Sequence, residues 1–173
     1  MNLLLHVCCG PCSLYVIDDI RETFKDCKIT GMFANPNIHP YDEFQRRMEN
    51  AQIALKNKDV PLVCVDDFDM EKWEKYEQDR KSRCKMCYTI RLERVADYAK
   101  ENGFTHFTTT LLVSPYQDHE MIKEIGERFA DKNDLIFVYR DFSKGFREGQ
   151  KQAREMRLYR QKYCGCIKSL YEK

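Results

Sequence analysis

Glycine and proline are scarce in this chain, which has seven Gly and five Pro among 173 residues. That scarcity excludes collagen-like, mucin-like and linker-like polymers. Aromatic residues make up 12% of the chain, which argues against disorder. Long apolar runs are also absent, since no stretch approaches the roughly 20 apolar residues of a membrane span. The apolar run at residues 3–7 is too short for a signal peptide and has no basic segment before it. The sequence therefore predicts a cytoplasmic protein without a membrane partner.

Several nucleotide-binding motifs are missing as well. The chain contains neither a GxxxxGK[ST] phosphate loop nor a GxGxxG dinucleotide fingerprint. It has no CxxxCxxC, the usual radical-SAM spacing, because position 15 after Cys8 and Cys12 is a tyrosine. The first strand ends in cysteines where ATP pyrophosphatases carry an SGGxDS loop. A related sheet that has exchanged its phosphate loop for cysteines fits this pattern.

Cysteine is the residue type in excess, with nine in the chain. An odd number cannot pair completely within one chain, and such a pattern in a cytosolic enzyme indicates metal binding or catalysis. Cys27 and Cys64 stand alone on apolar segments and are typical of small buried hydrophobic residues. The other seven fall into three short groups: Cys8, Cys9 and Cys12; Cys84 and Cys87; Cys164 and Cys166.

Strand and helix patterns alternate along the chain, which predicts one α/β domain over residues 1–173. The predicted sheet is mainly parallel and Rossmann-like, of the PP-loop or HUP-like kind, flanked by helices. Strands are predicted at residues 3–7, 29–34, 62–65, 107–112 and 135–139. Helices are predicted at residues 13–24, 41–57, 69–79, 84–102, 118–130 and 150–161.

Ligands of parallel sheets bind beyond the carboxyl ends of the strands. Residues 8–12 follow the first predicted strand, residues 35–39 the second, and residues 110–117 the fourth. We expect these three segments to face one edge of the sheet and to place a metal site there.

Charge is distributed unevenly although the net charge is only +1. Residues 144–173 carry nine Lys or Arg and three Glu, and a second basic stretch runs over residues 80–94 and includes Arg91. Arg147, Lys151 and Arg154 share one face of the last predicted helix. Such stripes can neutralise phosphates, although an ordinary solvated helix face explains the charge equally well.

Two pairs of cysteines supply enough thiolates for a four-thiolate site. Cys8 and Cys9, together with Cys84 and Cys87, belong to segments that open predicted helices, where backbone N–H groups stabilise thiolate charge. Thiolates grouped in this way hold either an iron–sulfur cluster or zinc. Their spacing favours a metal site without deciding between the two.

Two rival functions remain open on these residues. Cys9 and Cys12 enclose a CGPC turn between a strand and a helix, the pattern of a thiol–disulfide oxidoreductase, but that function leaves five grouped cysteines unused. A zinc-stabilised RNA-binding module without catalysis also fits the cysteines and the basic stripes.

Cys164 and Cys166 are separated only by Gly165, whose backbone freedom permits a small strained disulfide. Strained disulfides are the labile ones, so this pair is interpreted as redox-active. Further metal ligation is the first alternative, and a chemically inert tail is the second.

Taken in order, the motifs resemble one family, the QueH-type epoxyqueuosine reductases. The matching stretches cover nearly the whole chain and stand at residues 6–12, 35–40, 83–88, 91–92, 107–112, 114–117, 119, 141–142, 158–161 and 163–166. The resemblance implies reduction of the epoxide of epoxyqueuosine in a tRNA anticodon loop to the cyclopentene of queuosine. It further implies a 4Fe–4S cluster and an additional iron ion.

By motif, the resemblance carries the cluster ligands onto Cys8, Cys9, Cys84 and Cys87, and a redox-active disulfide onto Cys164 and Cys166. Cys12 is the first candidate for the additional iron, and Tyr116 or His119 for the proton donor. Arg147, Lys151, Arg154 and Arg91 are expected to contact the RNA backbone. The reaction also needs an electron donor, which the sequence does not identify.

Overall fold

The central strands form where short runs of branched and aromatic residues are buried on both faces, as in a parallel sheet covered by helices. The computed structural model describes residues 1–172, and its five-stranded sheet is parallel throughout, in the order β3-β2-β1-β4-β5. At its centre Leu3, Leu4 and Leu5 of β1 are completely buried. The strands are β1 (Asn2–His6), β2 (Lys28–Phe33), β3 (Leu62–Cys64), β4 (His106–Thr109) and β5 (Ile136–Phe137).

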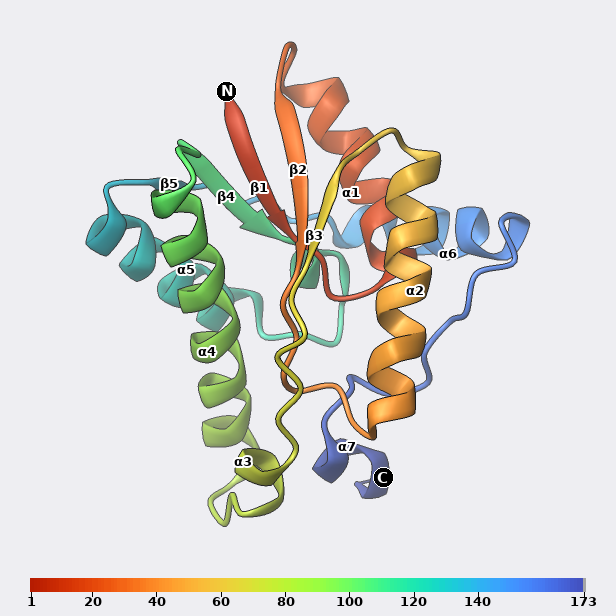
Figure 1. Ribbon diagram of the computed structural model, residues 1–173, viewed down its shortest axis with the longest axis vertical. Helices are drawn as coiled ribbons and strands as arrows, with labels where there is room; N and C mark the ends of the chain where they lie inside the picture. The colour runs from red at the N-terminus through yellow and green to blue at the C-terminus, as the bar shows by residue number, and fades with distance from the viewer. Residues whose placement is uncertain (173) are drawn as a thin grey trace.

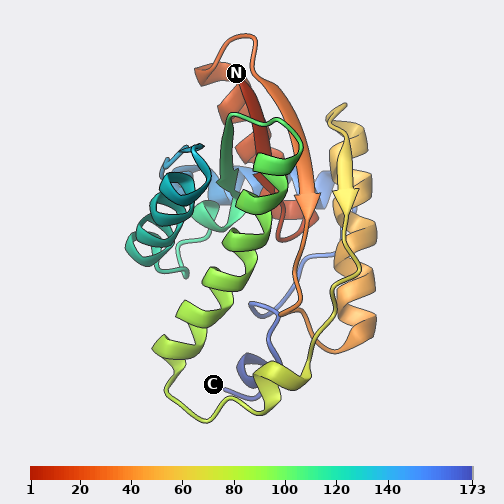
Figure 2. The same ribbon diagram turned by 60° about the vertical axis from the view of Figure 1, so that its left-hand side comes forward.

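Helices cover both faces of this sheet. On one face α1 (Gly10–Thr23) packs against both α2 (Tyr41–Asn57) and α6 (Phe146–Glu155), and on the other α4 (Arg80–Glu101) packs against α5 (His119–Asn133) (Figures 1 and 2). Two short helices, α3 (Glu71–Glu74) and α7 (Ile167–Tyr171), pack together beyond the carboxyl ends of the strands. The prediction of an α/β fold with a mainly parallel sheet flanked by helices is confirmed.

Several predicted elements have different bounds in the structure, and three of them illustrate the local causes. The fourth strand ends at Thr109, whose hydroxyl accepts from the N–H of Leu111 and opens the 3-10 turn η1 (Thr110–Val113). Helix α4 begins at Arg80, ahead of Cys84, because the Asp79 side chain caps it by accepting from the N–H of Ser82. The predicted helix at residues 69–79 shrinks to α3, in which only Trp73 is buried.

The last long helix is shifted toward the N-terminus relative to the prediction at residues 150–161. It starts at Phe146, directly after the 3-10 turn η2 (Ser143–Gly145), and Arg157, with a φ of 55°, turns the backbone out of the helix just after its end. Residues 156–166 then run as an extended segment across the carboxyl edge of the sheet. We call residues 156–166 the C-terminal strap.

Within residues 1–172 no helix is both long enough and apolar enough to cross a membrane. Lys173, the last residue of the predicted domain and of the basic stretch, lies outside the described residues.

Candidate metal and substrate site

The β1–α1 turn brings three thiols together. The ligating sulfur atoms of Cys8, Cys9 and Cys12 all lie within 4.8 Å of one another, the only such group of three potential ligands among residues 1–172. Cys9 serves as the N-cap of α1, and its sulfur accepts a hydrogen bond from the N–H of Cys12 at 3.3 Å. Gly10 permits this turn because a Cβ there would stand 2.6 Å from the carbonyl oxygen of Asn50 on α2.

Polar donors surround the sulfur atoms of this group. The hydroxyl of Thr110 lies 3.1 Å from Cys8 Sγ and also accepts from the backbone N–H of Cys8 at 2.9 Å. The side-chain amide of Gln161, from the C-terminal strap, donates to Cys9 Sγ at 2.8 Å. Hydrogen bonds of this kind stabilise thiolates and tune metals bound to them. The donor set therefore fits a thiolate-bound metal ion or cluster.

Arg91 is the buried cation of the site. It is 4% exposed, and its guanidinium donates to Asn35 Oδ1 at 2.8 Å and to Cys87 Sγ at 3.8 Å. Hydrogen bonds from the neighbouring thiols, Cys12 first, together with the charge of Arg91, hold the pKa of Cys8 below its usual value. The sequence predicts an RNA contact for Arg91, and in the structure its guanidinium also reaches the sulfur of Cys87.

His6, at the end of β1, belongs to the same buried layer. Its Nδ1 lies 2.8 Å from the Thr109 hydroxyl, and its Nε2 lies 3.0 Å from Asn35 Oδ1, so both ring nitrogens are engaged. Burial lowers the pKa of His6 to about 3, which keeps the imidazole neutral. His6 is thus a structural histidine that holds the ends of three strands together.

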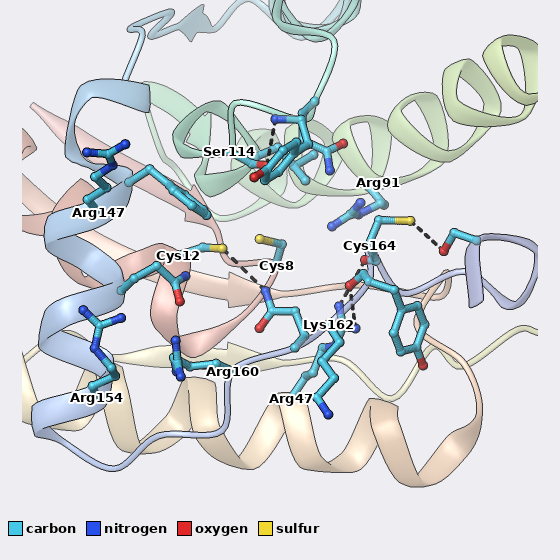
Figure 3. Close-up of a pocket in the computed structure, with 18 of the residues that line it drawn as sticks. Cys8, Cys12, Arg47, Arg91, Ser114, Arg147, Arg154, Arg160, Lys162 and Cys164 are labelled. Atoms are coloured by element: carbon cyan, nitrogen blue, oxygen red, sulfur yellow. Dashed lines mark hydrogen bonds between the residues drawn. The ribbon is translucent and has the colours of Figure 1, made fainter. Parts of the chain in front are cut away.

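The three thiols lie at one side of a large cavity of about 750 Å³, into which Cys8 and Cys12 open (Figure 3). Among the described residues that line this cavity, seven are Arg or Lys and none is Asp or Glu. The seven cations are Arg47, Arg80, Arg91, Arg147, Arg154, Arg160 and Lys162. Such a lining concentrates positive potential and attracts a polyanion.

The segments predicted to share one sheet edge do so. Residues of the β1–α1 turn and of the loop after β4 line the same cavity, and Asn35 after β2 donates from Nδ2 to the carbonyl oxygen of Val7 at 2.9 Å. The grouping follows from the parallel strand directions, because all carboxyl ends lie at one edge.

Cys84 and Cys87 stand apart from the three-thiol group. They line a second cavity of about 30 Å³ together with Cys164 and Cys166. The two cavities share part of their walls, because both are lined by Arg91, Gln117 and Cys164. The structure thus places the predicted ligands in two adjoining groups of sulfur atoms, with Arg91 between them.

Cys164 and Cys166 are free thiols in the structure and differ in their surroundings. Cys164 is exposed, and its Sγ lies 3.0 Å from the Ser169 hydroxyl. Cys166 is 6% exposed and packs with Trp73 and Cys87. The hydrogen bond from Cys166, with that from Ser169, lowers the pKa of Cys164 to about 6, whereas that of Cys166 is raised.

The remaining predicted site residues lie around the large cavity. Tyr116 lines it, is 84% exposed, and meets Phe146 edge to face with ring centroids 6.1 Å apart. Nε2 of His119 lies 2.8 Å from the carbonyl oxygen of Ser114, two residues before Tyr116. Arg147 and Arg154 line the cavity from α6 (Figure 3). Lys151 is an exposed residue of the same helix.

The sequence reasoning missed three groups of this site. The cavity wall includes Arg47, Arg160 and Gln161. The sequence pattern places them in the predicted helices at residues 41–57 and 150–161 and gives none of them a role in the site. The extended course of the C-terminal strap is what brings Arg160 and Gln161 to the thiols.

Comparison with known proteins decides the family. A family model described as epoxyqueuosine reductase QueH matches residues 3–172. This chain belongs to the QueH family. Three QueH relatives, each named epoxyqueuosine reductase QueH, match nearly all of it. The protein of Histophilus somni is 40% identical, covering 98% of this chain and 72% of the relative. That of Haemophilus influenzae is 38% identical, with coverages of 98% and 71%, and that of Thermotoga maritima is 35% identical, with coverages of 99% and 92%. Membership of the QueH family makes the chain an oxidoreductase.

Solved structures place the QueH fold among other parallel-sheet proteins. The U34-tRNA thiolase NcsA from Methanococcus maripaludis, solved with its [4Fe–4S] cluster, matches with a TM-score of 0.62 at 14% identity, over 94% of this chain and 59% of that one. A deacetylase of teicoplanin biosynthesis matches with a TM-score of 0.56 at 9% identity, over 90% of this chain and 83% of that one. At these identities the likeness concerns the fold alone.

Proposed function

We propose that this chain reduces epoxyqueuosine in tRNA to queuosine. The reaction takes up two electrons and two protons, removes the epoxide oxygen as water and leaves the ring double bond. One observation carries the proposal: the clustered thiols of Cys8, Cys9 and Cys12 lie beside a cavity that Cys8 and Cys12 line and whose charged lining residues are all cationic. A reducing centre and a surface for a polyanion therefore meet in one place.

The cofactor is part of the same proposal. We assign the ligands of a 4Fe–4S cluster to Cys8, Cys9, Cys84 and Cys87, and Cys12 as a ligand of an additional iron ion. Support comes from the two adjoining groups of sulfur atoms, which share Arg91 between them. When bound, such a centre supplies single electrons at low potential and a Lewis-acidic iron.

The chain's own residues have separate tasks in this reaction. Arg147, Lys151 and Arg154 hold the RNA backbone, and the unpaired anticodon loop lets the base reach the cavity without melting a duplex. Tyr116 lines the cavity and is the first candidate to donate a proton to the departing oxygen, with His119, at the start of α5, as the second. Cys164 and Cys166 exchange two electrons with an external donor through a disulfide.

The test begins with anaerobic purification, a visible spectrum, and iron and sulfide analysis. The protein is then incubated with epoxyqueuosine tRNA and a reductant, and the nucleosides are separated by mass. Loss of one oxygen atom from epoxyqueuosine supports the proposal, and the Cys84→Ala variant should lack this activity. A colourless protein that resists anaerobic reconstitution, or a Cys84→Ala variant as active as wild type, would overturn it. Zinc content would then separate an RNA-binding module from a metal-free dithiol enzyme.

A further inference from the structure

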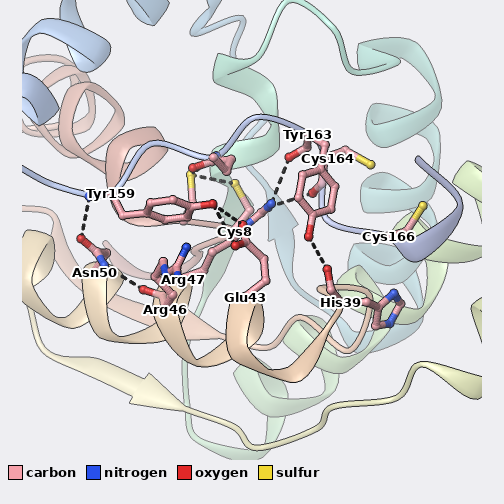
Figure 4. A network of polar contacts seen from close by, with 12 residues as sticks. Cys8, His39, Glu43, Arg46, Arg47, Asn50, Tyr159, Tyr163, Cys164 and Cys166 are labelled. Atoms are coloured by element: carbon pink, nitrogen blue, oxygen red, sulfur yellow. Dashed lines mark hydrogen bonds and ion pairs between the residues drawn. The ribbon is translucent and has the colours of Figure 1, made fainter. Parts of the chain in front are cut away.

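Arg47 is a buried cation of α2 that holds the backbone of the C-terminal strap (Figure 4). Its side chain is 2% exposed. Nη1 donates to the carbonyl oxygen of Cys164 and Nη2 to that of Tyr163, both at 3.0 Å. A guanidinium suits this task because its donors form a rigid planar fork that reaches two acceptors at once.

The guanidinium of Arg47 is itself held by a carboxylate of the same helix. Its Nε donates to Glu43 Oε1 at 2.8 Å, one turn earlier on α2. The hydroxyl of Tyr159, from the strap, donates to the other oxygen of the same carboxylate at 2.8 Å. Glu43 thus neutralises the buried charge and fixes the direction of the fork.

His39, in the loop between β2 and α2, holds the backbone on both sides of Cys166. The N–H of His39 donates to the carbonyl oxygen of Gly165 at 2.8 Å, and the N–H of Ile167 donates to His39 Nδ1 at 2.9 Å. Gly165 has a φ of 129°, and a Cβ there would stand 3.2 Å from Arg47 Nη1. The backbone from Tyr163 to Ile167 is therefore held by groups that do not involve either sulfur atom.

The held backbone gives the two sulfur atoms different neighbours. Cys164 lines the large cavity that Cys8 also lines. Cys166 lines only the small cavity, beside Cys84 and Cys87, and is buried. One thiol thus faces the substrate side and solvent, and the other faces the interior.

We propose that Arg47 is a positioning residue that presents Cys164, and not Cys166, to incoming thiols and substrate. The inference rests on the proposed redox role of the pair and deepens it. An external dithiol donor bonds to Cys164 Sγ, the Cys164–Cys166 bond breaks, and Cys166 leaves with the electron pair and takes up a proton. The second donor thiol then releases Cys164 as a thiol, so the donor becomes a disulfide and two electrons enter the pair.

The test measures the accessibility of each cysteine in the intact protein. Reduced, anaerobic protein receives a short pulse of iodoacetamide, and mass spectrometry gives the alkylation rate at every cysteine. We compare wild type with Arg47→Lys and Arg47→Gln, and use Lys56→Gln, an exposed cation of α2, as the matched control. Cys27, at the turn between α1 and β2, serves as the internal reference for general loosening of the fold.

The expected result is a rate at Cys164 about tenfold or more above that at Cys166 in wild type and in Lys56→Gln. In Arg47→Gln the ratio should fall to within about threefold while Cys27 stays unchanged, with Arg47→Lys between the two, because an ammonium cannot span both carbonyl groups. If Arg47→Gln does not fold, Glu43→Gln provides a second test. It removes the negative charge that holds the Arg47 guanidinium while keeping the size of the side chain, and it should also lower the ratio of the Cys164 rate to the Cys166 rate.

A wild-type ratio near one, or an unchanged ratio in folded Arg47 variants, would overturn the positioning role. The measurement needs no epoxyqueuosine, so it also separates the two proposals. A protein that shows the expected ratios but fails to reduce epoxyqueuosine tRNA would refute the proposed function alone.

Discussion

The side-chain amide of Gln161 donates to the sulfur of Cys9 at 2.8 Å, although the two residues are 152 positions apart in the chain. This hydrogen bond makes the C-terminal strap part of the environment of the β1–α1 thiols. It also brings the basic end of the chain over the large cavity, which Gln161 lines.

Replacing Gln161 by leucine should weaken metal retention at the thiol group. The substitution removes an N–H donor to Cys9 Sγ, and removal of such a supporting group typically costs about 10–100-fold in metal affinity. The measurement is the rate at which a chelator removes iron from the reconstituted protein. Gln45→Leu, on the exposed surface of α2, should release iron at the wild-type rate. If Gln161→Leu released iron no faster than Gln45→Leu, Gln161 would not support the bound metal.

Cys12 and Cys84 should have different effects on metal content. We expect Cys84→Ala to lower both iron and acid-labile sulfide after anaerobic reconstitution, because it removes a proposed cluster ligand. Cys12→Ala should lower iron and leave sulfide unchanged, because an isolated ion contributes no sulfide. A parallel loss of sulfide in Cys12→Ala would instead assign Cys12 to the cluster itself. Cys64→Ala, outside both sulfur groups, is the control.

The alkylation rate at Cys164 should level off at an unusually low pH. Its pKa of about 6 lies below the ordinary value of 9.0, so the reactive thiolate forms as pH rises through 6 and is nearly complete by about pH 7. Burial raises the pKa of Cys27, so the rate there should still be rising at about pH 9. In Ser169→Ala the Cys164 profile should move to higher pH, because the hydrogen bond between Cys164 Sγ and this hydroxyl, which lowers the pKa of Cys164, is lost. A Cys164 profile that follows that of Cys27 would contradict the assigned pKa.

Neutralising Arg147 and Arg154 together should weaken tRNA binding and flatten its salt dependence. For each phosphate of a single-stranded region that no longer meets a cationic side chain, the slope of log K against log salt becomes smaller by about 0.7. The variant Arg147→Gln/Arg154→Gln should therefore show a slope smaller by about 1.4 in binding titrations at several salt concentrations. The variant Arg128→Gln/Lys132→Gln removes the same charge from the exposed surface of α5 and should keep the wild-type slope. Equal slopes in the two double variants would place the RNA elsewhere.

The element pattern was predictable because alternating strand and helix periods, with their end signals, are local properties. Asp118 illustrates this, since it lies where a helix start was expected and its side chain caps α5 by accepting from the N–H of Met121. The shared sheet edge was predictable too, because parallel strands leave little freedom over where their carboxyl ends lie. Errors fell at helix ends, where a single residue such as Asp79 or Arg157 moves the boundary.

By itself, the sequence determined the parallel α/β class, the three cysteine groups and the edge of the sheet at which their chemistry is located. Only the tertiary structure decided that Gln161 reaches Cys9, that Arg91 turns inward to Cys87, and that Arg47 holds the strap carrying Cys164. The physical reason is range. Strand and helix periods arise from neighbours along the chain. The direction of a long cationic side chain is instead set by partners that folding brings from distant segments, because a buried charge must find a partner.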